Sequence, residues 1–326
     1  MSDKRIVKWG IMGPGGISGN FASELKHAPG AELVAVAGRS KEKAEMFASK
    51  YGVPRSYGSC EELAADPDVE IVYIGTLHPI HKENAITLLR GGKSILCEKP
   101  FTMTEEEAKE IVQEARDRGL FVMEAMWTRY LPVIRQVRQW LKDGAIGEVQ
   151  LLKAEFGFDV GWDPEGRLLN KAKGGGTLLD AGIYPISFAS MVFGGRPRRI
   201  HSNVYIGETG VDERFSLLFE YDKGRTASLH GAVRLSMNND AWIYGTKGKI
   251  HVDNFLASKK ATLFANGQDP VDVTDDRGFV GHAFQAIEAM DCLREGRKES
   301  AAMPADETVE IMATLDEIRA QWNLTY

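Results

Sequence analysis

IVKWGIMGPGGIS, residues 6–18, is the stretch on which the fold prediction rests. The apolar run 6–12 predicts a strand, and the loop that follows has the spacing G-x-G-x-x-S, in which the first glycine permits a tight turn and the second lets the backbone approach a pyrophosphate. Serine replaces glycine or alanine at the third position. A plain strand–helix turn explains such a loop in isolation, but its place ahead of a strand–helix series predicts dinucleotide binding at Gly13, Gly15, Gly16 and Ile17.

The next hundred residues alternate short apolar runs with amphipathic segments. Strands are predicted at 32–37, 56–57, 70–75, 94–98 and 120–124, and helices at 17–27, 41–50, 60–65, 79–90 and 104–118. Thr104 caps a first turn of three glutamates, and Gly119 ends that helix. Alternation of this kind builds right-handed βαβ units, so the sequence predicts a Rossmann doubly wound parallel sheet with helices on both faces.

The second part of the chain has a different pattern. Helices are predicted at 131–142, 177–192, 281–295 and 305–322, a strand at 149–158, and several strands in succession between 199 and 252. Consecutive strands without helices between them indicate an antiparallel sheet. We therefore expect an α/β protein with two domains: residues 1–125 form the dinucleotide-binding domain, and residues 126–326 form an α+β domain with an open, mainly antiparallel sheet for substrate binding and dimerisation.

Composition limits the function classes. The chain has 326 residues and a net charge of −6, which disfavours a nucleic-acid or anionic-membrane partner. Its three cysteines show no metal-ligand or disulfide spacing. We find neither a secretory signal at the N-terminus nor a run of 18 uncharged apolar residues, so the sequence predicts a cytoplasmic protein without bound metal that spans no membrane.

The end of the second strand distinguishes between nicotinamide cofactors. An NAD enzyme would place a carboxylate there to bind the ribose 2′-hydroxyl. This chain has Arg39 and Ser40 instead, with Lys43 one turn later, and these groups can donate to a 2′-phosphate. Glu42 and Glu45 are expected to face away. A helix-capping serine flanked by surface charges is the simpler interpretation, but the pattern favours NADP over NAD.

Two later strands end in polar residues. Ligands of open α/β sheets bind beyond the carboxyl ends of the strands, so Thr76, Leu77, His78 and His81 are predicted to line the cofactor cleft, although either histidine could be a cap or surface residue. The fifth strand runs into Glu98-Lys99-Pro100 at the same edge. A solvated strand end is the simple explanation, and a reaction site is the alternative.

Glu-Lys-Pro at this place, after a glycine loop, resembles the Gfo/Idh/MocA oxidoreductase family over essentially the whole chain. The segments CEKPFTMTEEEA, RGLFVMEAMWTRYLP and GGGTLLDAGIYPISFASMVFGG are similar to its branch of dimeric dihydrodiol dehydrogenases and NADP-dependent D-xylose dehydrogenases. The resemblance implies a Rossmann domain followed by a domain with an open antiparallel sheet. Tyr184 stands where many relatives outside the branch have histidine, which argues against the inositol dehydrogenase subgroup.

The glycine run is followed by Asp180 and Tyr184, which share one face if the segment is helical. The resemblance implies that both face the nicotinamide beside Lys99. Free tyrosine has a pKa near ~10, and a nearby ammonium lowers it by favouring the phenolate. We therefore predict Tyr184 as general acid/base, Lys99 as the group that tunes it and holds ribose or substrate, and Asp180 as an orienting residue. Glu98 is expected to orient Lys99 or contact the nicotinamide ribose.

Aromatic residues suited to a sugar face or a cyclic diol complete the predicted site. Trp127, Phe156, Phe158 and Trp162 are candidates for an apolar wall, although each alone is more typical of a core. Arg129 is predicted to hold a polar substrate or to support a dimer interface.

The leading hypothesis is an NADP-dependent oxidoreductase that moves hydride between nicotinamide and the C1 hydroxyl of an aldose such as D-xylose, or a trans-dihydrodiol. One alternative is a reductase of dicarbonyl or ketosugar substrates that uses the same residues in reverse. Another is a non-catalytic NADP(H)-sensing protein, but such a protein need not keep proton-transfer residues. A homodimer formed through the second sheet is expected.

Overall fold

The computed structural model describes residues 5–326, which form two compact units. The first unit runs to Trp127 and also includes Phe279–Val309, and the second comprises Thr128–Gly278 and Glu310–Tyr326. Segment 279–309 thus groups with the N-terminal part of the chain, and the functional division at residue 125 stays a prediction. The prediction of no secretory signal rests partly on residues 1–4, which lie outside the described residues.

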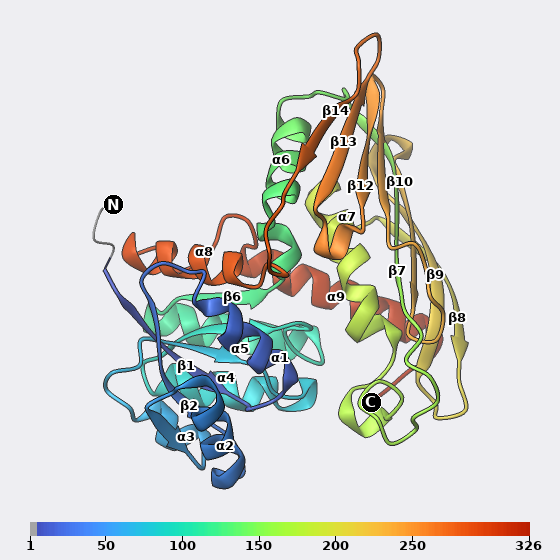
Figure 1. Ribbon diagram of the computed structural model, residues 1–326. Helices are drawn as coiled ribbons and strands as arrows, with labels where there is room; N and C mark the ends of the chain where they lie inside the picture. Colours follow the sequence, from blue (N-terminus) through green and yellow to red (C-terminus); the bar gives the residue numbers. More distant parts are fainter. Residues whose placement is uncertain (1–4) are drawn as a thin grey trace. The chain divides into compact units, whose positions relative to one another are not determined.

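The first unit contains a six-stranded parallel sheet in the order β3-β2-β1-β4-β5-β6, so the predicted doubly wound sheet is confirmed (Figure 1). Every residue of β4 and β5 is buried, as expected for parallel strands covered on both faces. The strands are β1 (Val7–Met12), β2 (Ala31–Ala37), β3 (Arg55–Tyr57), β4 (Ile71–Ile74), β5 (Ser94–Glu98) and β6 (Val122–Ala125).

Helices of the first unit form two groups. Helix α4 contacts α3 and α5, whereas α1 contacts α2 and α8, so each group covers one face of the sheet. Thr104 accepts a hydrogen bond from the Glu107 amide as the cap of α5, and Gly119 ends that helix with φ of 61°. The helices are α1 (Gly16–Leu25), α2 (Lys41–Tyr51), α3 (Cys60–Ala64), α4 (His81–Arg90), α5 (Glu105–Arg118) and α8 (Ala283–Arg294).

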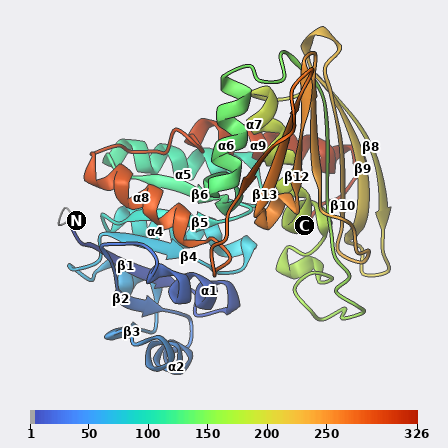
Figure 2. The same cartoon turned by 45° about the horizontal axis from the view of Figure 1, so that its top comes forward.

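The second unit contains an eight-stranded sheet in the order β14-β13-β12-β11-β7-β10-β9-β8 (Figure 2). The pair β7–β10 is parallel and the other neighbours are antiparallel, so the predicted mainly antiparallel sheet is confirmed. The strands are β7 (Val149–Gly157), β8 (Arg199–Ile206), β9 (Asp212–Glu220), β10 (Thr226–Ala232), β11 (Ala241–Gly245), β12 (Gly248–Asp253), β13 (Lys260–Ala265) and β14 (Val271–Thr274).

Helices α6 (Pro132–Lys142) and α7 (Ile183–Phe193) pack on one face of this sheet. Both views show them on the same side of the strands (Figures 1 and 2). Helix α9 (Ala305–Trp322) belongs to the first unit as far as Val309 and to the second from Glu310 onward. Burial along β9 and β10 alternates, so one face of the sheet is core and the other is open.

One segment differs from its predicted form. The helix predicted at 177–192 begins as a π-helix, Leu178–Gly182, and continues as α7. The helical run Lys171–Phe193 is long and apolar enough to resemble a membrane span by composition, but 83% of its apolar window is buried inside the protein. Core helices of soluble proteins have the same character.

Candidate active site

The loop between β1 and α1 is closed by its serine. Ser18 is fully buried, and its hydroxyl donates to the Gly13 carbonyl at 2.6 Å. Gly13 has φ of +98°, and a Cβ there would lie 2.7 Å from Thr76 Cγ2, so glycine is required. The departure from the usual third glycine or alanine is therefore accommodated, because serine packs at the same small position and fastens the turn.

The same loop has the backbone shape that a dinucleotide needs. Gly15 caps α1 and Gly16 is its first residue, and both are exposed. A Cβ on Gly16 would meet no atom within 4 Å, so space lies open in front of the first amides of the helix. These amides and the helix dipole favour an anion at that place. Gly13, Gly15, Gly16 and Ile17 therefore fit a bound pyrophosphate.

At the end of β2, one expectation was wrong. Ser40 caps α2 by accepting a hydrogen bond from the Lys43 amide at 3.3 Å, as the simpler interpretation held. However, Glu42 does not face away, because the Ser40 hydroxyl donates to its carboxylate at 2.7 Å. Arg39 and Lys43 are exposed. The predicted 2′-phosphate site thus has two cations and one carboxylate within five residues of sequence.

After β4, the predicted cleft residues are half-buried or buried. Thr76 and Leu77 are half-buried, and His78 begins a 3₁₀ turn, His78–Ile80. His81 is fully buried, and its ring nitrogens lie 3.0 Å from the Pro100 carbonyl and 3.1 Å from the Thr76 carbonyl. Burial lowers the pKa of His81, so it is neutral at pH 7. The histidine links the loops that follow β4 and β5.

The end of β5 is buried, so it is not a solvated strand end. Glu98 is 5% exposed, and its carboxylate accepts hydrogen bonds from the Tyr73 hydroxyl at 2.5 Å and from the Lys99 amide at 3.2 Å. Burial raises the pKa of Glu98, and the Tyr73 hydroxyl and the Lys99 charge oppose that rise. Tyr73 was not identified from the sequence. A tyrosine within the otherwise apolar strand EIVYIG was the available signal, because its buried hydroxyl needs a hydrogen-bond partner.

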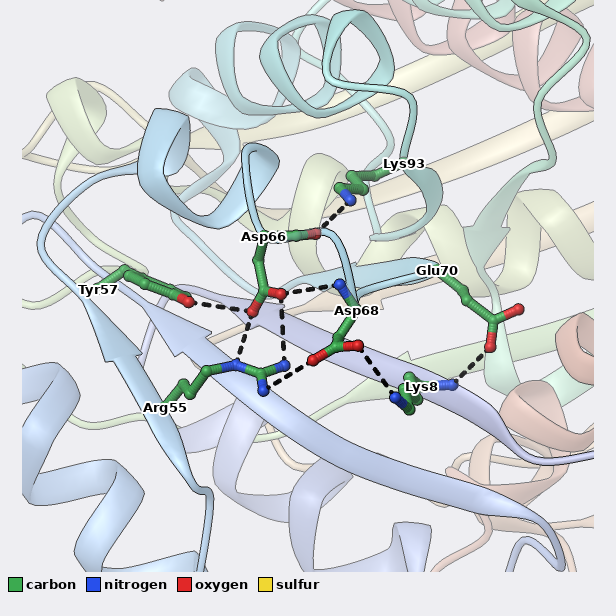
Figure 3. Close-up of polar contacts among 7 residues, drawn as sticks. All are labelled: Lys8, Arg55, Tyr57, Asp66, Asp68, Glu70 and Lys93. Atoms are coloured by element: carbon green, nitrogen blue, oxygen red, sulfur yellow. Dashed lines mark hydrogen bonds and ion pairs between the residues drawn. The ribbon is translucent and has the colours of Figure 1, made fainter.

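A charged cluster lies at the opposite, amino edge of the same sheet (Figure 3). Arg55 pairs with Asp66 at 2.8 Å and with Asp68 at 3.1 Å. Lys93, which precedes β5, donates to the Asp66 backbone carbonyl. Since ligands of parallel sheets bind at the carboxyl edge, this cluster fastens the loop between α3 and β4 and is structural. The figure also draws Lys8, Tyr57 and Glu70.

In the second unit, Asp180 and Tyr184 are both buried, at 6% and 7% exposed. Asp180 lies in the π-helix and Tyr184 in the first turn of α7. Arg167 donates to Asp180 at 2.7 Å, and no local pattern in the sequence pointed to that partner. The Phe156 ring meets the Tyr184 ring edge-on at 5.5 Å, so these two predicted residues lie together.

The other predicted substrate residues have varied surroundings. Arg129 is buried and donates to the hydroxyl and the carbonyl of Ser187, in α7. Trp162 is half-exposed beneath the Arg234 guanidinium, which lies 5.1 Å from its ring centroid. Trp127 is buried, and its ring stacks on His282 at 4.7 Å. His282 was not identified from the sequence, because it lies more than 150 residues away from Trp127.

A parallel Rossmann-type sheet followed by a mainly antiparallel sheet is the arrangement of a class of oxidoreductases, and comparisons with known proteins show that class. Residues 7–126 match the profile described as "Oxidoreductase family, NAD-binding Rossmann fold", and residues 134–251 match the "GFO/IDH/MocA C-terminal domain". The chain belongs to the Gfo/Idh/MocA family, as its sequence segments predicted. The predicted enzyme class, an NAD(P)-dependent dehydrogenase or reductase acting on CH–OH groups, is confirmed.

Three similar proteins illustrate the match. The trans-1,2-dihydrobenzene-1,2-diol dehydrogenase of Xenopus tropicalis is 37% identical, with 98% of this chain and 99% of that protein covered. An aldose-aldose oxidoreductase from Caulobacter crescentus superposes with a TM-score of 0.88 at 22% identity, covering 97% of each chain. A 3-ketoreductase from Actinomadura kijaniata, crystallised with NADP, superposes with a TM-score of 0.84 at 22% identity, covering 97% of this chain and 98% of that chain. The two solved structures, at this identity, establish the fold alone.

Proposed function

We propose that this protein is an NADP-dependent dehydrogenase that transfers hydride between nicotinamide and a hydroxyl-bearing carbon of a trans-dihydrodiol or of a sugar, such as C1 of D-xylose. The substrate class is supported by the dihydrodiol dehydrogenase name of a relative that is similar over the full length. The reverse direction, reduction of a dicarbonyl or ketosugar, would use the same residues.

The observation that carries the proposal is the position of Lys99. It follows the buried Glu98 directly at the carboxyl end of β5, and β4 separates β5 from the strand that ends in the glycine loop. The bond from the Lys99 amide to the Glu98 carboxylate fixes the backbone at this point. A lysine held at the ligand-binding edge of the sheet is suited to a bound nucleotide or its substrate.

The proposed roles follow from the chemistry of each group. Bound NADP supplies the hydride acceptor at its nicotinamide ring. Tyr184 takes the proton of the substrate hydroxyl, and Lys99 lowers the pKa of the phenol so that this transfer proceeds near neutral pH. Asp180 orients the substrate or Lys99, while the hydrogen bond from Arg167 fixes the position of the Asp180 carboxylate.

Surrounding residues are proposed to bind rather than react. Thr76, Leu77 and His78 line the cofactor edge, and Glu98 orients Lys99. His81, predicted for the same edge, is fully buried with both ring nitrogens bonded to carbonyls, so it supports the loops instead. Phe156, which contacts Tyr184, supports an apolar face for a ring-shaped substrate. Trp127, Trp162 and Arg129 are proposed as further substrate contacts, with the bonds from Arg129 to Ser187 favouring an indirect role through α7.

We also propose a cytoplasmic homodimer formed through the open face of the eight-stranded sheet. Trp242 lies on that face, with ring centroids 6.0 Å from Tyr244, 6.2 Å from Phe264 and 4.2 Å from His251. These four side chains are half-buried in the single chain. A stacked aromatic group on an uncovered sheet is typical of an interface core.

The test is a screen of cyclic trans-diols, pentoses and hexoses for NADPH formation, with dicarbonyls and ketosugars assayed in reverse. Tyr184→Phe removes the proton-transferring hydroxyl, so we expect kcat to fall by roughly 10²-fold or more while cofactor affinity is unchanged. Tyr221→Phe is the matched control, since Tyr221 is also buried in this unit but stacks on Phe193.

Two outcomes would contradict the proposal. Near-normal turnover by Tyr184→Phe would remove the tyrosine from the mechanism. Absence of activity across the panel in both directions, with NADP bound normally, would favour a non-catalytic NADP(H)-sensing protein instead.

A further inference from the structure

Asp212, the first residue of β9, is a buried carboxylate that the proposed mechanism does not use. Its exposed fraction is 0%, and among residues 5–326 no Lys, Arg or His nitrogen forms an ion pair with it. A buried charge without a cation is costly, so a protein that retains one usually satisfies it with hydrogen bonds. The bonds of Asp212 therefore indicate what it holds.

Those bonds run to the turn that carries Asp180. Asp212 Oδ2 accepts a hydrogen bond from the Leu178 amide at 2.6 Å, and Leu178 is the first residue of the π-helix. The Tyr326 hydroxyl donates to Asp212 Oδ1 at 3.5 Å. Gly176 has φ of +117°, and a Cβ there would lie 2.2 Å from Asp212 Oδ1. The last glycine of the Gly174–Gly176 run is thus required by the approach of this carboxylate.

Strand β9 contacts the π-helix at its other end as well. A Cβ on Gly182 would lie 2.5 Å from Cε1 of Phe215, so the last residue of the π-helix packs directly on the Phe215 ring. Asp212 and Phe215 together hold both ends of the five-residue turn Leu178–Gly182. Asp180 lies inside this turn and Tyr184 two residues after it. Since π-turns depart from regular helical geometry, such outside support is needed to define it.

We propose that Asp212 is a positioning residue that sets the orientation of Asp180 and Tyr184 by holding the amino end of their turn. The inference rests on the proposed function insofar as it gives these two residues a catalytic role. Within residues 5–326, the hydrogen bonds of Asp212 come from backbone amides and from Tyr326, so it acts through the turn and not on the substrate.

The charge of Asp212 gives the proposal a distinctive signature. Burial raises the pKa of Asp212 to about 7, and the Leu178 amide and the Tyr326 hydroxyl oppose that rise. The nearby titratable groups are Tyr326, Arg319 over the Tyr326 ring at 5.4 Å, and Glu213, which pairs with Arg234 at 3.7 Å. Above pH 7 both Asp212 oxygens accept hydrogen bonds, and below pH 7 one becomes a donor. Since the raised pKa means that burial disfavours the ionised form, opening of the turn that hydrates Asp212 becomes easier above pH 7, and the turn is held more firmly on the acid side.

Three variants of the full chain separate these effects. Asp212→Ala removes the acceptor, so we expect faster hydrogen exchange of the amides at 177–184 and at least a tenfold lower kcat, with the NADP dissociation constant within twofold of the parent. Asp212→Asn keeps an amide oxygen for Leu178 but cannot titrate, so it should restore most of kcat and abolish the pH dependence of exchange near 7. Asp275→Ala, which removes a carboxylate bonded to Arg277, is the control. It should leave both kcat and the exchange of the amides at 177–184 unchanged.

If Asp212→Ala does not fold, Tyr326→Phe carries the test. It removes a hydrogen bond that favours the ionised carboxylate, so the pH midpoint of exchange at 177–184 should move upward. The proposal is overturned if Asp212→Ala shows parental kcat and exchange, or if Asp212→Asn and Tyr326→Phe keep the parental pH dependence. Exchange requires no turnover, so it tests Asp212 even if the substrate screen fails. Conversely, a lower kcat with unchanged exchange would refute positioning and leave the proposed function intact.

Discussion

Arg39 and Lys43 are the side chains on which the choice between NADP and NAD depends. Both are cationic, but the Ser40 hydroxyl lowers the pKa of Glu42, which keeps that carboxylate ionised beside them at neutral pH. A 2′-phosphate would be attracted by two cations and repelled by one anion. Turning the Ser40 hydroxyl from Glu42 to the phosphate exchanges one charge-assisted hydrogen bond for another, so the preference for NADP depends on the two cations.

We expect NADP to bind at least tenfold more tightly than NAD, a difference of about 1.4 kcal/mol. Replacing Arg39 and Lys43 together by alanine should erase the difference, and Glu42→Gln should increase it. Lys50→Ala, in the last turn of the same helix, is the matched control. Titration calorimetry with both dinucleotides measures each effect. Equal affinities in the parent would show that the assignment to NADP is wrong.

Individual site residues were predictable where their position along a strand fixes their place in the fold. The glycine loop and Lys99 follow buried strands, and the carboxyl ends of parallel strands share one edge. Partners supplied by distant segments were not predictable, because nothing in local sequence links Asp180 to Arg167 or Trp127 to His282. The prediction for Glu42 was wrong because it considered only the direction in which the helix would point that side chain. A hydrogen bond from the neighbouring Ser40 holds the carboxylate near the predicted phosphate site instead.

Helices α1 and α8 are joined by one carboxylate although they are far apart in the sequence. Glu24, near the end of α1, accepts hydrogen bonds from the amides of Val280 at 3.0 Å, Gly281 at 2.9 Å and Ala283 at 3.3 Å. It also lies 3.4 Å from His282 Nδ1. Glu24 therefore caps the start of α8 and supports the histidine on which Trp127 stacks.

This cap has a calculable pH dependence. Burial would raise the pKa of Glu24, but hydrogen bonds from His282 and the Gly281 amide lower it to about 2, below its ordinary 4.5. Its stabilisation is thus fully present above pH 4.5 and is lost as pH falls toward 2. We expect Glu24→Gln to lower the free energy of unfolding by about 2–3 kcal/mol at pH 7.

Denaturant titrations at several pH values measure this loss. The difference in the free energy of unfolding between variant and parent should become smaller as the pH falls from 5 to 3. Glu110→Gln, which breaks an exposed pair with Lys82, is the control and should leave the free energy of unfolding nearly unchanged, because solvent screens exposed ion pairs. If the difference in the free energy of unfolding did not depend on pH, the destabilisation would come from packing and not from the charge of Glu24.

Elements with strong periodicity were predicted nearly to their ends, whereas weakly patterned ones were not. Helix α5 and strand β5 have clear caps and a continuous apolar run, so their bounds followed from local sequence. Strands β13 and β14 were not predicted, because β14 is short and largely exposed and gains its form from pairing with β13. The π-helix was not predicted because it depends on contacts with Asp212 and Phe215. Hydrophobic periodicity carries no information about such contacts.

The two sheets differ in how their faces are covered, and this difference bears on assembly. Both faces of the parallel sheet are packed by helices, whereas the eight-stranded sheet has α6 and α7 on one face only. Its open face carries Trp242 and its stacked neighbours, with the Lys249 ammonium 5.3 Å from the Trp242 ring centroid. Burying such a face against the same face of a second copy gives a closed twofold dimer and exposes no further surface.

We therefore expect light scattering to give the parent a mass of twice 36.0 kDa. Trp242→Glu places an unpaired carboxylate at the centre of the proposed interface and should weaken the dimer by roughly 100-fold or more, because a buried charge without a partner costs several kcal/mol. Met46→Glu, on the exposed side of α2, is the matched control and should leave the mass unchanged. A monomeric parent would refute the dimer, and a dimeric Trp242→Glu would place its interface elsewhere on the surface.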